Sequence, residues 1–149
     1  MISRIKKHIN LSKENNLAKI IKDIWILTQT GTVVFKRVFN SNVNAQLFGG
    51  LMSALNSFAN ELESGGLTNF GSSSMKFTLL KNHDFLFVCT AEKKVKEKRL
   101  HEVIMKVAEK FFNLYPAEWF KNEWDGDISL FDNFVNEIKF ALQEPVKKV

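Results

Sequence analysis

The stretch IWILTQTGTVVFKRVF, residues 24–39, decides the fold. Its first part, residues 24–28, is a short apolar run, and the turn signal Thr30-Gly31 follows it. Residues 32–39 are then rich in β-branched and aromatic side chains, which favour strands. Two such runs around a glycine turn predict a β-hairpin, whose first strand is apolar on both faces.

A helical pattern follows the hairpin. Large apolar side chains recur at steps of three and four residues from Leu47 to Leu62, and Gly65-Gly66 ends the pattern. This predicts a long amphipathic helix. Gly49 and Gly50 lie within it, and each costs about 1 kcal/mol of helix propensity relative to alanine. We therefore expect the helix backbone to pack closely on a sheet or on a partner.

Three more strands are predicted, over residues 67–70, 75–80 and 85–90. The last of them is apolar on both faces, as is the first strand of the chain. A strand of this kind is buried on both sides. Both strands should therefore be central in a sheet that carries helices on each face.

The rest of the chain predicts two more helices. Periodic apolar residues from Leu100 to Leu114 form the first, which ends before Pro116. A loop that holds Trp119 and Trp124 comes next, and a third helix over residues 129–142 completes the pattern, with Leu130 in its apolar stripe.

The net charge of +5 is carried by residues 1–22, which hold six basic residues and one acidic residue. The remaining 15 basic and 15 acidic residues cancel, so the body of the chain is neutral. A neutral body argues against nucleic acid as a partner, because such binding usually needs a basic folded face. We expect a basic, amphipathic helical extension over residues 1–22 and one domain over residues 23–149.

Arg4, Lys6 and Lys7 alternate with Ile2, Ile5 and Ile9 in this extension. The arrangement suits a peripheral contact with an anionic membrane or an acidic partner. The alternative is a solubilising leader that folds against the domain. No apolar run approaches the roughly 18 residues of a membrane span, and no secretion signal precedes the domain, so we expect a cytoplasmic protein.

No pattern typical of an active site is present. Cys89 lies inside an apolar run and is expected to pack as a small hydrophobe. His8, His83 and His101 stand in no motif, and no cluster has the spacing of metal ligands. The phosphate-binding loop of a GTPase is also missing from the sequence. We therefore expect no enzymatic activity, no metal and no cofactor.

The order strand, strand, helix, three strands, helix, helix resembles the longin fold. The resemblance rests on the hairpin 24–35, on LMSALNSFA at 51–59 and on Gly65-Gly66-Leu67, and it spans about residues 23–142. It implies an α/β domain of the α+β kind. The sheet would have five antiparallel strands in the order 2-1-5-4-3, with one helix on one face and two on the other.

The resemblance also implies a class of function. Longin domains and their roadblock relatives lack catalytic residues, and they occur in trafficking adaptors, membrane-fusion proteins and assemblies that bind or regulate small GTPases. The chain would then be a protein-interaction module that pairs with itself, as a homodimer, or with another longin or roadblock domain, and that contacts a small GTPase. The basic extension departs from many longin domains, and the two final helices depart from most roadblock domains, so the branch stays open.

Four residues are candidates for a protein interface. They are Gly49 and Gly50, which would let a partner approach the helix, and Trp119 and Trp124, which are either core plugs or binding anchors. A different class of function stands beside this one. A ligand-sensing domain of the PAS or profilin kind would need a cavity between sheet and helix, with polar groups converging on it.

Overall fold

The hairpin predicted from residues 24–39 is present in the computed structural model, which describes residues 19–38, 48–49, 52, 67–71 and 75–144. Strand β1 spans Asp23–Thr28 and β2 spans Val33–Arg37. The turn between them needs Gly31, whose φ of 92° is a left-handed conformation that glycine adopts without strain. Its amide donates a hydrogen bond to the carbonyl of Thr28 at 3.0 Å.

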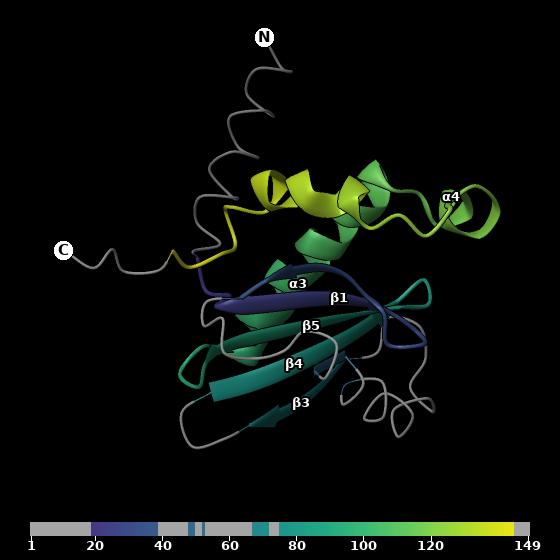
Figure 1. The fold of residues 1–149 in the computed structure, drawn as a ribbon. Coiled ribbons are helices and arrows are strands. Elements are labelled where there is room, and N and C mark those ends of the chain that lie inside the picture. Colours follow the sequence, from purple (N-terminus) through teal and green to yellow (C-terminus); the bar gives the residue numbers. More distant parts are fainter. Residues whose placement is uncertain (1–18, 39–47, 50–51, 53–66, 72–74, 145–149) are drawn as a thin grey trace, which may run out of the picture.

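Three further strands complete an antiparallel sheet. They are β3 (Leu67–Gly71), β4 (Met75–Asn82) and β5 (Phe85–Glu92). The strand order is β2-β1-β5-β4-β3, and Figure 1 shows β1 and β5 side by side in the middle. The order matches the expectation, and so does the central place of the two strands that are apolar on both faces.

Alternate residues of the central strands face opposite sides of the sheet. On β1, Ile24 and Ile26 join one buried cluster, whereas Trp25 and Leu27 join another. Strand β5 divides in the same way, with Phe87 and Cys89 on the first side and Leu86 and Val88 on the second. Each face must therefore be covered, because burial of one large apolar side chain contributes about 1.5–3 kcal/mol.

Helix α3 (Glu97–Leu114) covers the first face. Its inward residues lie three or four positions apart, so that one stripe of the helix meets the sheet. Phe111 is fully buried and its ring lies edge-on to that of Phe87, with 5.7 Å between the centroids. The buried residues of the helix are Leu100, Val103, Ile104, Val107, Ala108 and Phe111.

The segment after α3 differs from the prediction in two ways. The expected loop contains a short helix, α4 (Ala117–Asn122), in which the amide of Phe120 donates to the carbonyl of Pro116. The expected α-helix over 129–142 is instead a 3₁₀ helix, η1 (Ser129–Glu137). Phe131 and Phe134 are both fully buried, and a helix with three residues per turn places residues three apart on one side.

Three described residues, 48, 49 and 52, lie over the second face of the sheet. Residues 48, 49 and 52 are helical, and the ring of Phe48 stacks on Trp25 with 3.9 Å between centroids. Met52 joins the same buried cluster. These residues lie within the first predicted helix, on the side of the sheet opposite α3. The rest of that helix falls outside the described residues.

The two ends of the described chain are fastened together. Ile21 forms a parallel bridge with Leu142, and the amide of Gln143 donates to the carbonyl of Ile21 at 2.8 Å. The Arg37 guanidinium donates to the carbonyl of Lys22 at 2.8 Å and also to that of Gln143. We call this group of contacts the terminal clasp.

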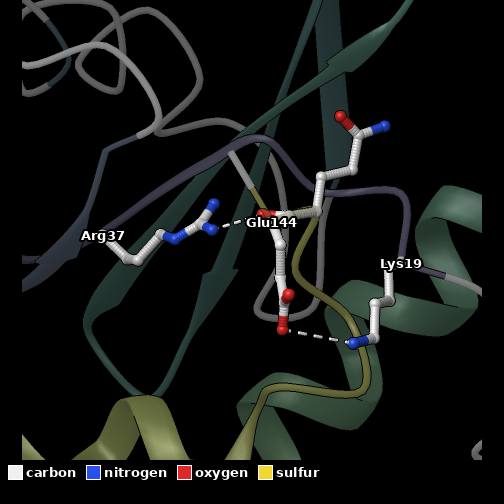
Figure 2. A network of polar contacts seen from close by, with 4 residues as sticks. Lys19, Arg37 and Glu144 are labelled. Atoms are coloured by element: carbon white, nitrogen blue, oxygen red, sulfur yellow. Dashed lines mark hydrogen bonds and ion pairs between the residues drawn. The ribbon is translucent and has the colours of Figure 1, made fainter. Parts of the chain in front are cut away.

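An ion pair adds to the terminal clasp. Lys19 and Glu144 approach to 3.5 Å, and Figure 2 shows Arg37 and Lys19 reaching the same segment from different sides. Both partners are more than half exposed, so the pair adds little stability by itself.

The predicted boundary at residue 22 needs correction. Ile21 is fully buried and Ile20 is 9% exposed, and both belong to the core cluster under α3. Residues 20–22 are not helical, because Ile21 pairs with Leu142 instead. The domain body therefore includes these residues. The expected helical extension over residues 1–18 lies outside the described residues.

Gly49 gives a test of the packing on the second face. A Cβ atom at this position would lie 2.5 Å from the backbone oxygen of Gly31 and 3.0 Å from a methyl carbon of Leu27. Gly49→Ala should therefore destabilise the domain by about 1–3 kcal/mol, as overpacking does. Chemical denaturation measures the change. Stabilisation by about 1 kcal/mol, the ordinary gain for alanine in a helix, would contradict the close approach.

Arg37 gives a test of the terminal clasp. Arg37→Ala should lower the free energy of unfolding by about 2–3 kcal/mol, because two carbonyls lose a charged donor. Arg37→Lys should recover only part of the loss, since an ammonium lacks the forked geometry. Lys36→Ala, at an exposed neighbouring position, is the control and should change stability by less than about 0.5 kcal/mol. Equal effects at the two positions would show that the Arg37 hydrogen bonds contribute nothing to stability.

Candidate interaction surfaces

The sheet has two edges, formed by β2 and β3. Within the described part of the chain, no strand pairs with the outer side of either one. The end of β2 is tied to Gln143 through Arg37. Strand β3 pairs with β4 on its inner side, from Leu67 opposite Leu80 to Gly71 opposite Lys76. The unpaired backbone of an edge strand can accept a strand from another chain, and β3 is the more open edge among the residues described.

An aromatic cluster fills the space between α3, α4 and η1. The Phe120 ring stacks on Phe131 and on Phe111, each with 5.7 Å between centroids. Trp119 and Trp124 are partly buried against the same core, and the Trp124 indole donates to the carbonyl of Asp127 at 3.0 Å. Both tryptophans therefore pack within the domain, which is the role of a core plug. A further role as binding anchors stays a prediction.

Three large apolar residues are exposed near this cluster. Leu114, Ile128 and Leu130 are 48%, 43% and 48% exposed. The Tyr115 hydroxyl donates to the carbonyl of Leu130 at 3.3 Å, which brings the end of α3 beside the start of η1. The sequence placed Leu114 and Leu130 in the apolar stripes of two predicted helices, yet both side chains are about half exposed. In η1 the buried positions are Phe131 and Phe134, so Leu130 faces outward.

The connection between α4 and η1 is held by its own polar groups. Gly126 has a φ of 90° at the tip of the turn. The Asp127 carboxylate accepts hydrogen bonds from the amide and the hydroxyl of Ser129, at 3.0 and 2.7 Å. These bonds lower the pKa of Asp127. The Asp125-Gly126-Asp127 sequence therefore forms a turn.

Cys89 lies at the centre of β5 and is fully buried. Burial, and after it the charge of Asp23, raises the pKa of the thiol well above its usual range. The nucleophilic thiolate is therefore suppressed. His83 sits in the β4–β5 turn, with its ring 4.8 Å from that of Phe112. Over the described ranges, no three metal-binding side chains come together.

The remaining predicted site residues divide into two groups. Gly49 is buried against the β1–β2 turn, so packing within the domain accounts for the glycine. Arg4, Lys6, Lys7 and Gly50 lie outside the described residues. The described helices include none with the length and apolar character needed to cross a membrane.

Two solved structures are similar in fold. Myxococcus xanthus MglB aligns with a TM-score of 0.54 and 11% sequence identity, over 71% of this chain and 89% of MglB. A roadblock/LC7 domain from Streptomyces avermitilis aligns with a TM-score of 0.53 and 15% identity, over 70% of this chain and 92% of that domain. At these identities the likeness concerns the fold alone. No curated protein sequence matches the chain.

A family model matches the sequence more specifically. It describes the first longin domain of FUZ, MON1 and HPS1, and it matches residues 22–115. The matched residues run from the start of β1 to the end of α3, and α4 and η1 lie beyond them. The match spans more than half of the chain and includes the hairpin and the two central strands. The chain belongs to the family of the first longin domain of FUZ, MON1 and HPS1.

Proposed function

We propose that this chain is a non-catalytic interaction module that pairs with itself or with another longin or roadblock domain. In this proposal the paired module binds or regulates a small GTPase or a trafficking complex. Membership of the longin family is the observation that carries it. The GTPase and trafficking partners come from the longin resemblance of the sequence, and they are part of the proposal.

The described surfaces are compatible with pairing through the sheet. Strand β3 offers a row of backbone donors and acceptors at an edge, and a second strand could extend the sheet there. The suppressed Cys89 thiol gives no support to an enzyme. A binding role needs only the edge and its neighbouring side chains.

A ligand-sensing domain is the second candidate, and one observation favours it. The indole nitrogen of Trp25 is buried without a hydrogen-bond partner among the described residues. An unpaired buried donor costs about 1–3 kcal/mol, and a ligand acceptor would remove that cost. A ligand site nevertheless needs several converging polar groups, and Trp25 supplies one. The interaction module is therefore the better-supported proposal.

Solution mass tests the proposal as a whole. Light scattering should give a dimer for the chain alone, or a stable complex when a longin domain, a roadblock domain or a small GTPase is added. Co-elution in size-exclusion chromatography identifies which of these binds. A monomer that co-elutes with none of them would contradict the proposal.

Two adjacent proline substitutions locate the contact. Backbone N–H groups of neighbouring residues in an antiparallel edge strand point to opposite sides. Of Thr68→Pro and Asn69→Pro, one therefore removes a donor to β4 and should destabilise the fold. The other removes an outward donor and should weaken pairing about tenfold or more, with little change in thermal unfolding. Full pairing by the variant that keeps normal thermal unfolding would exclude β3 as the interface.

A further inference from the structure

One end of the sheet brings together segments that are far apart in the sequence. Ile24 at the start of β1 pairs with Arg37 at the end of β2, and Met75 at the start of β4 pairs with Glu92 at the end of β5. Helix α3 begins five residues after Glu92, at Glu97. Lys76 joins the same end, because its ammonium donates to the carbonyl of Val95 at 2.7 Å.

This end of the domain is strongly basic. We define the basic end as residues 19–24, 35–37, 75–76, 91–99 and 143–144. It contains ten basic residues and four acidic residues, a net charge of +6. The basic residues are Lys19, Lys22, Lys36, Arg37, Lys76, Lys93, Lys94, Lys96, Lys98 and Arg99, and the acidic ones are Asp23, Glu92, Glu97 and Glu144. The four lysines from Lys93 to Lys98 are all exposed.

The opposite end of the domain has the opposite charge. Residues 116–132, which include α4 and the turn before η1, hold five acidic residues and only Lys121 as a basic one, a net charge of −4. All five acidic side chains are exposed. In Figure 1, α4 lies at the right, and the described chain begins and ends at the left. Positive and negative charges are therefore separated along the sheet.

The terminal clasp attaches both outer segments to the basic end. Lys19 and Glu144, the first and last described residues, lie 3.5 Å apart at their charged groups. Residues 1–18 add four basic residues and one acidic residue, and residues 145–149 add Lys147 and Lys148. The two segments continue from neighbouring ends of the described chain, and their net charges are +3 and +2.

We propose that the basic end is a docking face for an anionic membrane surface. Each basic residue held near such a surface strengthens binding about fivefold. Ile2, Ile5 and Ile9 alternate with basic residues in the attached segment, and apolar side chains in this setting enter a lipid interface. Nucleic acid offers no comparable place for them, and an acidic protein would need an apolar groove beside its negative charge. Repulsion from the acidic end orients α4 away from the membrane.

Binding of the full chain to vesicles tests the proposal. Vesicles of phosphatidylcholine with phosphatidylserine should bind the chain, and vesicles of phosphatidylcholine alone should not. Lys93→Glu, which changes the charge of the basic end by two units, should weaken binding about 25-fold. Lys121→Glu makes the same change at the acidic end and should leave affinity nearly unchanged. Thermal unfolding of both variants checks that each is folded.

A third variant separates the domain from the attached segment. Replacing Arg4, Lys6 and Lys7 together by alanine should weaken binding about 100-fold, and this loss should add to that of Lys93→Glu. If only the segment variant loses affinity, the basic end is not a docking face. Equal losses for Lys93→Glu and Lys121→Glu would overturn the proposed orientation. Binding to duplex DNA without binding to vesicles would show that the partner of the basic end is not a membrane.

The vesicle-binding test is independent of the pairing proposed above. Pairing is measured as a solution mass without lipid, whereas docking is measured as the difference between two vesicle compositions. If the chain pairs but does not bind anionic vesicles, the proposed function stands and the membrane-docking inference is wrong.

Discussion

Strands β1 and β5 pair along six consecutive residues, from Asp23 opposite Thr90 to Thr28 opposite Phe85. Both strands send large apolar side chains to each face of the sheet. Neither face can be left in water, so α3 and η1 cover one side and the helical residues around Phe48 lie on the other. The two-sided burial of this pair is the constraint from which the layered architecture follows.

A central first strand also decides how the chain closes. The residues that lead into β1 must pass over an end of the sheet, and there Ile20 and Ile21 fill the core under α3. The segment after η1 returns to the same end and pairs with Ile21. Arg37, from the neighbouring edge strand, bonds to the carbonyls of Lys22 and Gln143. One side chain therefore joins three parts of the chain that the sequence keeps apart.

Three surfaces of this longin domain differ in charge and in the groups that they expose. Strand β3 offers a backbone edge, the basic end concentrates positive charge, and the residues around α4 combine negative charge with exposed Leu114 and Leu130. The last of these surfaces is built largely from residues beyond the family match.

The sequence by itself determined the elements whose pattern depends on local spacing. Apolar periodicity and turn residues predicted the hairpin, the three later strands, α3 and the central place of β1 and β5. The buried face of each element imposes this periodicity directly on the sequence. Local spacing predicted the structure less well after Pro116. It did not distinguish an α-helix from η1. It also put Leu130 in the apolar stripe, whereas a change from 3.6 to 3 residues per turn rotates that side chain outward.

Only the tertiary structure decided the distribution of charge and the closure of the chain. Summing charges along the sequence gave a neutral body. Lys36, Lys76 and Lys93 belong to different segments, and strand register brings them to one end of the sheet. The bonds from Arg37 to Lys22 and Gln143 depend in the same way on long-range pairing. Such contacts have no sequence period, because they arise where strands and helices meet in space.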